Sequence, residues 1–334
     1  MLNRRILRLK AFKVLYGSVL SDNMSLSQAQ SQLDVACEAA RDLYVYMLGV
    51  VSPLTRLAQN RIEAAKTKFN PTEEELNPNT KFADNALAKL LDSDVDFQKV
   101  YKKKKFDWDQ YDLFLKKVLN SIQSKEYYAE YMNSGKTSLA EDCKLFTRIF
   151  EEEFVDSAEL EQILEDKSLY WNDDLAYSLT WCCKTLKTFA KGESWSLIPL
   201  YQSEMMSGAD VESDLAFVRK LLQASFAGYE RYSTMVSESV SGWEKDRLFS
   251  TDMVLIVMGL AEAASFPTIP LKVTINEYVE ISKFYGAPKS RAFVNGLLDR
   301  LIQKLLEEGK IVKEVRDLCN NRISLDNINQ IIES

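Results

Sequence analysis

Five cationic side chains within the first thirteen residues are the clearest candidates for chemistry in this chain. They are Arg4, Arg5, Arg8, Lys10 and Lys13, and no acidic residue lies among them. On a helix the three arginines fall within about 100° of arc, and the two lysines fall on a different face. Guanidinium groups on one face can contact successive phosphates and stack on bases, which predicts a nucleic-acid site. A solvated basic helix end is the alternative.

The segment 286–293 is a second candidate for nucleic-acid binding. It holds the cations Lys289 and Arg291, and Ser290 between them is expected to cap the following helix. Free N–H groups at a helix N-terminus favour a phosphate. The ring of Phe293 can stack on an unpaired base, and packing of this ring in the core is the alternative.

Two short amphipathic helices must position that segment. The first is expected to begin at Pro270, and Gly286 and Pro288 separate it from the second. The apolar positions are Leu271, Ile275, Tyr278 and Ile281 in the first helix and Phe293, Gly296, Leu297 and Leu301 in the second. Because a mid-helix glycine costs about 1 kcal/mol relative to alanine, Gly296 predicts close approach by another element.

The chain contains no histidine, which excludes His-based acid–base catalysis and nearly all common zinc and copper sites. The five cysteines form no CxxC pair, and Cys182 and Cys183 are adjacent, which disfavours a bond between them. We therefore predict reduced thiols in a cytoplasmic protein, with no catalytic residue, metal site or cofactor. No apolar run approaches the roughly 20 residues of a membrane span, so no membrane partner is expected.

Two other motifs have structural explanations that we favour. The lysines of residues 102–105 lie among aromatic residues, as in some nucleic-acid patches, but a core stripe accounts for the aromatics. That stripe consists of Trp108, Tyr111, Leu115, Val118 and Leu119. Residues 134–137, SGKT, resemble part of a P-loop, but Glu130 stands where its first glycine is required.

The composition predicts an all-α protein. Only 11 glycines and 7 prolines punctuate 334 residues, which favours long helices. The net charge of −7 means that an RNA site must be a local basic patch on an acidic body. Residues 69–80 are the clearest linker candidate, and residues 203–210 are a second possible junction.

Several of these residues together resemble one family. KVTINEYVEISKFYG followed by SRAFVNGLLDR is similar to the C-terminal signature of the NusB family of all-helical, RNA-binding transcription antitermination factors. The resemblance continues upstream through Trp243, Arg247, Asp252 and Glu262. The N-terminal run RRILR, with Ala11, Leu15 and Tyr16, resembles the arginine-rich first helix of the same family. These pieces cover roughly a third to two fifths of the chain.

The resemblance implies a function and a set of sites. It implies binding of boxA-like single-stranded RNA together with the ribosomal protein NusE, as part of an RNA polymerase antitermination complex. The implied RNA-binding residues are Arg4, Arg5, Arg8, Lys10, Tyr16, Lys289, Ser290, Arg291 and Phe293. Glu262 matches an acid on the helix that faces NusE in the family. The chain departs from the family pattern at Val257, Lys289 and Ala292, which changes part of the partner surface and the position of charge in the turn.

The resemblance also predicts how the domains are organised. We expect a NusB-like helical bundle enlarged by an inserted helical block. Residues 1–24 would form its first helix, residues 25–210 the insertion, residues 211–308 the C-terminal core and residues 309–334 a helical extension.

The sequence allows two alternatives to an RNA-binding factor to be compared with it. A helical protein–protein scaffold that has lost RNA binding remains open, given the acidic net charge and the departures at Val257 and Ala292. An RNA cytosine methyltransferase with a NusB-like domain is disfavoured, because no GxGxxG motif occurs and no proline directly precedes a cysteine.

Overall fold

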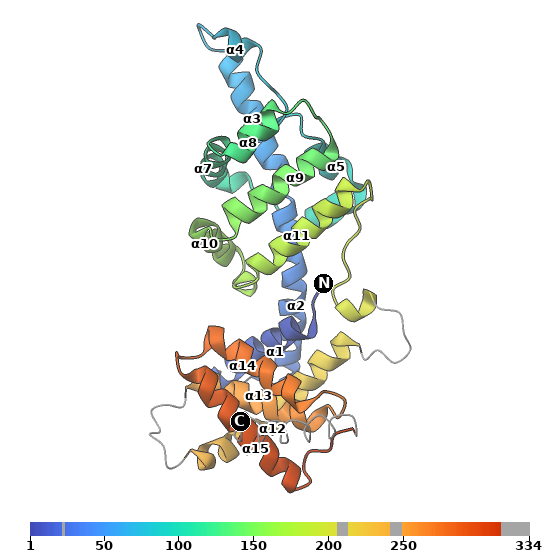
Figure 1. Ribbon diagram of the computed structural model, residues 1–334, viewed down its shortest axis with the longest axis vertical. Helices are drawn as coiled ribbons and strands as arrows, with labels where there is room; N and C mark the ends of the chain where they lie inside the picture. The colour runs from blue at the N-terminus through green and yellow to red at the C-terminus, as the bar shows by residue number, and fades with distance from the viewer. Residues whose placement is uncertain (22–23, 206–212, 241–248, 315–334) are drawn as a thin grey trace, which may run out of the picture. The chain divides into compact units, whose positions relative to one another are not determined.

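The computed structural model describes residues 1–21, 24–205, 213–240 and 249–314 (Figure 1). Helices account for its regular structure, which confirms the predicted all-α class. Across these ranges there is no strand, although Leu2 and Tyr201 form an isolated parallel bridge. None of the helices in them is long and apolar enough to cross a membrane. The chain divides into two compact units.

Unit 1 comprises Met1 and Glu38–Leu200. It contains the second part of α2 (Leu26–Leu48), then α3 (Val51–Lys66), α4 (Glu73–Leu76), α5 (Ala86–Ser93), α6 (Val95–Lys103), α7 (Asp112–Gln123), α8 (Glu126–Asn133), α9 (Leu139–Ile149), α10 (Ala158–Lys167) and α11 (Leu175–Ala190). Short 3₁₀ turns at Asp109–Tyr111 and Leu169–Trp171 and a π-helical turn at Phe150–Phe154 connect them. The predicted linker at residues 69–80 includes α4, whose start is fixed by a capping box between Thr72 and Glu75.

Aromatic packing forms much of the core of unit 1. Trp108 is buried, its ring stacks on Tyr46 at 4.3 Å between centroids, and its indole N–H donates to the Tyr46 carbonyl at 3.2 Å. Leu115, Val118 and Leu119 of α7 are buried too, as the predicted stripe requires. The side chains of residues 102–105 are exposed.

Unit 2 comprises Leu2–Cys37 and Tyr201–Ser334, described as far as Glu314. It holds α1 (Arg4–Leu20), the first part of α2, a 3₁₀ turn at Gln202–Met205, α12 (Asp214–Ser239), α13 (Ser250–Ser265), α14 (Leu271–Tyr285) and α15 (Ser290–Glu307). Helix α13 packs against α1, α12, α14 and α15. It is buried on nearly all sides from Val254 to Ala263, as expected for a helix that is apolar all round.

The unit boundaries differ from the predicted insertion at residues 25–210. Residues 26–37 belong to unit 2, where Arg219 of α12 forms an ion pair of 2.7 Å with Asp34 of α2. Residues 201–205 also belong to unit 2. In the predicted C-terminal extension, residues 309–314 are not helical, and residues 315–334 lie outside the described ranges.

Two predictions about the signature helices are wrong. A Cβ added at Gly296 would meet no atom within 4 Å, so no element approaches that backbone closely. The close approach occurs at Gly259 instead, where a Cβ would lie 2.6 Å from Leu298 Cδ2. Ser290 is the first residue of α15 and makes no side-chain cap, because its hydroxyl is directed to Asp252.

Candidate nucleic-acid interface

The first two turns of α1 carry the three arginines. Asn3 caps the helix, its side-chain oxygen accepting from the Ile6 N–H at 3.0 Å. One face of α1 is buried through Leu7, Ala11 and Leu15, among others. The arginines therefore emerge beside α12, α13 and α14, and each of them meets a carboxylate from one of those helices.

Arg4 lies over the start of α12. Its Nε is 3.4 Å from Asp214 Oδ1, and its guanidinium stands 4.7 Å from the centroid of the Phe217 ring. Asp214 is itself fixed by Ser203, whose N–H donates to Asp214 Oδ2 at 2.8 Å and whose hydroxyl accepts from the Asp214 N–H. The Arg4 side chain remains 33% exposed.

Arg5 forms a forked ion pair with Glu277 of α14. Its Nε donates to Glu277 Oε2 at 3.0 Å and its terminal nitrogen to Glu277 Oε1 at 2.7 Å. The hydrogen bonds and the charge of Glu277 raise the pKa of Arg5 above its ordinary value. The arginine side chain is 59% exposed and the glutamate 14%, so the pair is open on the arginine side.

Arg8 is buried, which sets it apart from its neighbours. It donates two hydrogen bonds to Glu262, of 2.7 and 2.8 Å, and Glu262 also accepts from Thr274 at 2.8 Å and Tyr278 at 3.0 Å. Burial opposes the charge of Arg8, but the hydrogen bonds and charge of Glu262 outweigh it and raise the pKa of Arg8. Burial and the nearby Glu262 charge raise the pKa of Tyr278 as well.

This network ties α1 to α13 and α14. Arg8 and Glu262 were expected to contact RNA and NusE, yet the Arg8 side chain is 4% exposed and that of Glu262 is fully buried. Neither has a free surface in this structure. Their geometry supports a positioning role, with Arg8 holding the first turn of α1 against the centre of unit 2.

The other two candidates on α1 differ in accessibility. Lys10 is buried. Tyr16 is half-buried, its ring stacks against Phe12, and its hydroxyl lies 3.3 Å from the Ser250 hydroxyl of α13.

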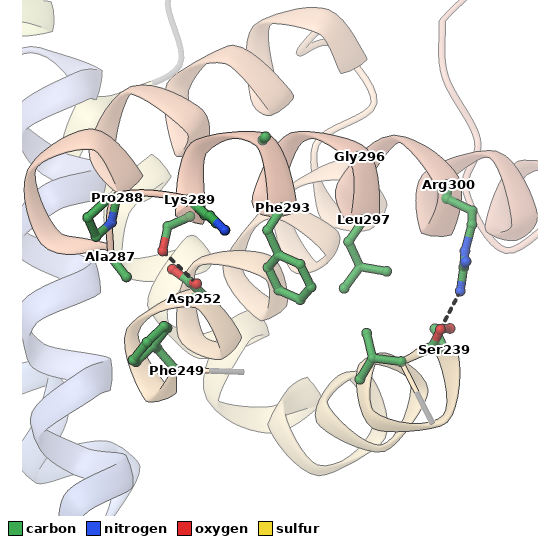
Figure 2. A pocket seen from close by; sticks show the side chains of 13 residues that line it. Ser239, Phe249, Asp252, Ala287, Pro288, Lys289, Phe293, Gly296, Leu297 and Arg300 are labelled. Carbon is green, nitrogen blue, oxygen red and sulfur yellow. Dashed lines mark hydrogen bonds between the residues drawn. The ribbon is translucent and has the colours of Figure 1, made fainter. Parts of the chain in front are cut away.

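The turn before α15 borders a pocket of about 740 Å³ (Figure 2). Its lining is mainly apolar and comprises Ser239, Val240, Phe249, Asp252, Ala287, Pro288, Lys289, Ser290, Ala292, Phe293, Gly296, Leu297 and Arg300. Figure 2 shows the Phe293 ring directed from α15 towards this space. Phe293 is half-buried, whereas Lys289 and Arg291 are exposed.

Ser290 and Asp252 form a buried polar contact in the pocket wall. The Ser290 hydroxyl donates to Asp252 Oδ2 at 2.7 Å, and both residues are buried. Burial raises the pKa of Asp252, and the Ser290 hydrogen bond opposes the rise. Ser290 therefore offers no free hydroxyl to a ligand. Trp243 and Arg247 lie outside the described residues.

Cations of α1 and of the turn before α15 both act on a carboxylate of α14. The pKa of Glu280 is lowered first by its hydrogen bond with Lys283, and the charges of Arg5 and Arg291 lower it further. One carboxylate on α14 is thus within electrostatic range of a cation from each candidate segment. The structure brings together Arg4, Arg5, Lys289, Arg291 and Phe293 in one unit, with accessible side chains.

Sequence reasoning missed the acids that face the arginines. Asp214 and Glu277 lie 210 and 272 positions away from their partners. The only local signal for Glu277 is its place on the signature helix, one position from the buried Tyr278. Among the residues that the structure describes, no three His, Cys, Asp or Glu side chains are placed so that they could hold a metal ion.

Helical architecture throughout the described part of unit 2, with cationic side chains on α1 and on the turn before α15, suggests a class of nucleic-acid-binding protein, and similarity to known proteins identifies the family. The NusB family model matches residues 197–303, nearly all of which belong to unit 2. The transcription antitermination protein NusB of Myxococcus xanthus is 31% identical over 127 residues, covering 33% of this chain and 91% of that protein. The corresponding protein of Salinibacter ruber is 30% identical over 114 residues, covering 34% of this chain and 69% of that protein. No solved structure gives a significant match.

The chain therefore belongs to the NusB family. The family match leaves most of unit 1 unmatched, since it begins at residue 197.

Proposed function

We propose that this protein is an RNA-binding transcription antitermination factor without catalytic activity, acting in the cytoplasm. The observation that carries the proposal is the set of accessible cations on α1 and on the turn before α15, within the part of the chain that belongs to the NusB family. Relatives in that family are named transcription antitermination proteins.

In this proposal the ligand is boxA-like single-stranded RNA of ribosomal RNA transcripts. Arg4 and Arg5 contact phosphates from one side, and Lys289 and Arg291 contact them from the turn. Phe293 provides a stacking face for an unpaired base at the mouth of the pocket. The N-terminal end of α15, where the helix dipole is positive, adds a favourable site for a phosphate.

NusE and the RNA polymerase antitermination complex are the proposed protein partners, by analogy with the family. Glu262 contributes indirectly, because it is buried and bound by three side chains. It maintains the packing of α13 against α1 and α14, and residues exposed on the surface of unit 2 would make the contact with NusE.

A helical scaffold without RNA affinity is the second candidate. One observation favours it: Arg4, Arg5 and Arg8 all face carboxylates of the same chain. If those pairs persisted in the presence of RNA, the net positive charge available on α1 would be small.

A salt titration separates the two candidates. Binding of boxA-containing RNA and of a scrambled RNA is measured with and without NusE, for the wild type and for Arg4→Ala/Arg5→Ala. The proposal expects preference for boxA, enhancement by NusE and a log–log salt slope about 1.4 units shallower in the variant, since each lost phosphate contact removes about 0.7.

The matched control is Arg56→Ala/Arg148→Ala, two ion-paired arginines of unit 1 that are 61% and 54% exposed. This control should leave the slope unchanged. Equal binding of both RNAs, with no response to NusE or to the α1 arginines, would reject the antitermination proposal in favour of the scaffold.

A further inference from the structure

We infer that Glu277 is a built-in competitor of RNA phosphate for Arg5 and thereby limits the affinity of the α1 surface. This inference rests on the proposed RNA function. It concerns one carboxylate whose position in the structure matches the position that a bound phosphate would need.

The geometry of the pair supports competition. Arg5 uses Nε and one terminal nitrogen to hold both oxygens of Glu277, at 3.0 and 2.7 Å. A phosphate group binds an arginine through the same fork of parallel N–H donors. While the Glu277 pair is formed, Arg5 cannot offer that fork to RNA.

The surroundings of the pair make an exchange of partners feasible. Arg5 is 59% exposed and can turn towards solvent, whereas Glu277 is 14% exposed and stays beside α1. Glu277 Oε2 also lies 3.8 Å from the remaining terminal nitrogen of Arg8. When Arg5 leaves, Glu277 therefore keeps a cationic neighbour, so the release does not strand an unpaired carboxylate.

The other two arginine pairs lack this combination. The Arg8–Glu262 pair is buried, and Thr274 and Tyr278 also bind its carboxylate. Arg4 is less exposed than Arg5, and its Nε lies 3.4 Å from Asp214 Oδ1, a longer contact than either contact of Arg5 with Glu277. Arg5 is thus the arginine of α1 at which an internal carboxylate and an external phosphate compete most directly.

The test compares Glu277→Gln with Glu280→Gln. Both substitutions remove one negative charge from α14, but Glu280 is paired with Lys283. Glu277→Gln keeps the side-chain shape and weakens the hold on Arg5. We expect it to tighten binding of boxA-containing RNA about three- to fivefold at moderate salt, as for release from an exposed ion pair. Glu280→Gln should change affinity by less than about 1.5-fold, because the charge it removes is exposed and screened.

Arg5→Gln and Arg5→Gln/Glu277→Gln complete a double-mutant cycle. The gain from Glu277→Gln should disappear in the Arg5→Gln background, and thermal melts should show that all variants are folded. If wild-type RNA binding is too weak to measure, binding by Glu277→Gln that is lost in Arg5→Gln/Glu277→Gln would also support the inference.

Equal gains in RNA affinity from Glu277→Gln and Glu280→Gln would overturn the competitor role, and so would a gain that persists in the Arg5→Gln background. Either result would mean that the loss of one negative charge on α14 explains the effect. In that case wild-type binding of boxA would leave the proposed function intact. Failure of every variant to bind RNA would overturn both.

Discussion

Arg4, Arg5 and Arg8 on α1 and the four lysines of residues 102–105 at the end of α6 are both short basic runs close to aromatic rings. Their charges are balanced in different ways. The arginines meet carboxylates on α12, α13 and α14. The lysines are exposed, lie at a helix C-terminus where the helix dipole favours cations, and one of them, Lys104, pairs with Asp42.

This difference shows that a basic run is not by itself a binding surface. On α1 the cations hold helices together, and a ligand must exchange with an internal partner. At the end of α6 the cations are exposed, Lys104 pairs with Asp42 of α2, and the core stripe accounts for the aromatic residues. Four experiments test this comparison, in order of expected effect.

Arg8→Met should have the largest effect. It leaves the Glu262 carboxylate buried without its cation, so the free energy of unfolding of unit 2 should fall by about 3–5 kcal/mol. Urea unfolding measures the change in stability, and hydrogen exchange of amides in α1 and α13 shows whether these helices are the ones affected. The double variant Arg8→Met/Glu262→Leu should recover much of the lost stability. If Arg8→Met alone lowers the free energy of unfolding by less than about 1 kcal/mol, the Arg8–Glu262 pair does not stabilise unit 2 as proposed.

Gly259→Ala should have the second largest effect on stability. Gly259 lies on α13, the helix that also carries Glu262. The added Cβ would lie 2.6 Å from Leu298 Cδ2, and relief of that overlap should cost about 1–3 kcal/mol. Gly296→Ala is the control. It meets nothing within 4 Å and should stabilise α15 by up to about 1 kcal/mol, as seen in the melting temperature. A stable Gly259→Ala variant would mean that α15 shifts easily.

Arg4→Ala/Arg5→Ala should weaken binding of boxA RNA about tenfold at low salt, because two phosphate contacts are lost. Lys102→Ala/Lys103→Ala/Lys105→Ala removes three exposed cations from the other cluster and should change affinity by less than about twofold. Fluorescence anisotropy with labelled RNA measures both. A larger effect from the lysine variant would reverse the assignment of the two clusters.

Asp42→Asn should have the smallest effect. Burial raises the pKa of Asp42 above its ordinary 3.8, and Lys104 only partly opposes this. A carboxyl with a raised folded-state pKa contributes stability below its unfolded pKa and loses that contribution as pH rises through the folded value. Asp42→Asn should therefore stabilise unit 1 by less than about 1 kcal/mol at pH 7 and give no advantage below about pH 4. A melting-temperature series against pH tests this, and destabilisation at pH 7 would show that the Lys104 pair dominates.

The helical class and the two signature helices could be predicted from the sequence because both depend on local apolar periodicity. Pro270 marks the start of the first helix, and Gly286 and Pro288 mark the break between the two. It predicted the cations of α1 but not their partners. Arg5 and Glu277 are 272 positions apart, and neither residue type nor spacing reveals such a pair. Ser290 shows a related limit: a good capping residue at a helix start bonds to Asp252 because tertiary contact offers a charged acceptor.

The contact between Arg8 and Glu262 joins positions 254 apart, whereas unit 1 is almost entirely one continuous stretch between them. During synthesis at about 5–20 residues per second, α1 would wait about 13–50 s for its partners on α13. Unit 1 could fold in the first part of that interval, before α12 is made, while the first helix of the chain stayed undocked and open to proteases or chaperones. Nascent chains arrested before Asp214, the first residue of α12, should accordingly contain a protease-resistant unit 1 and a cleavable α1.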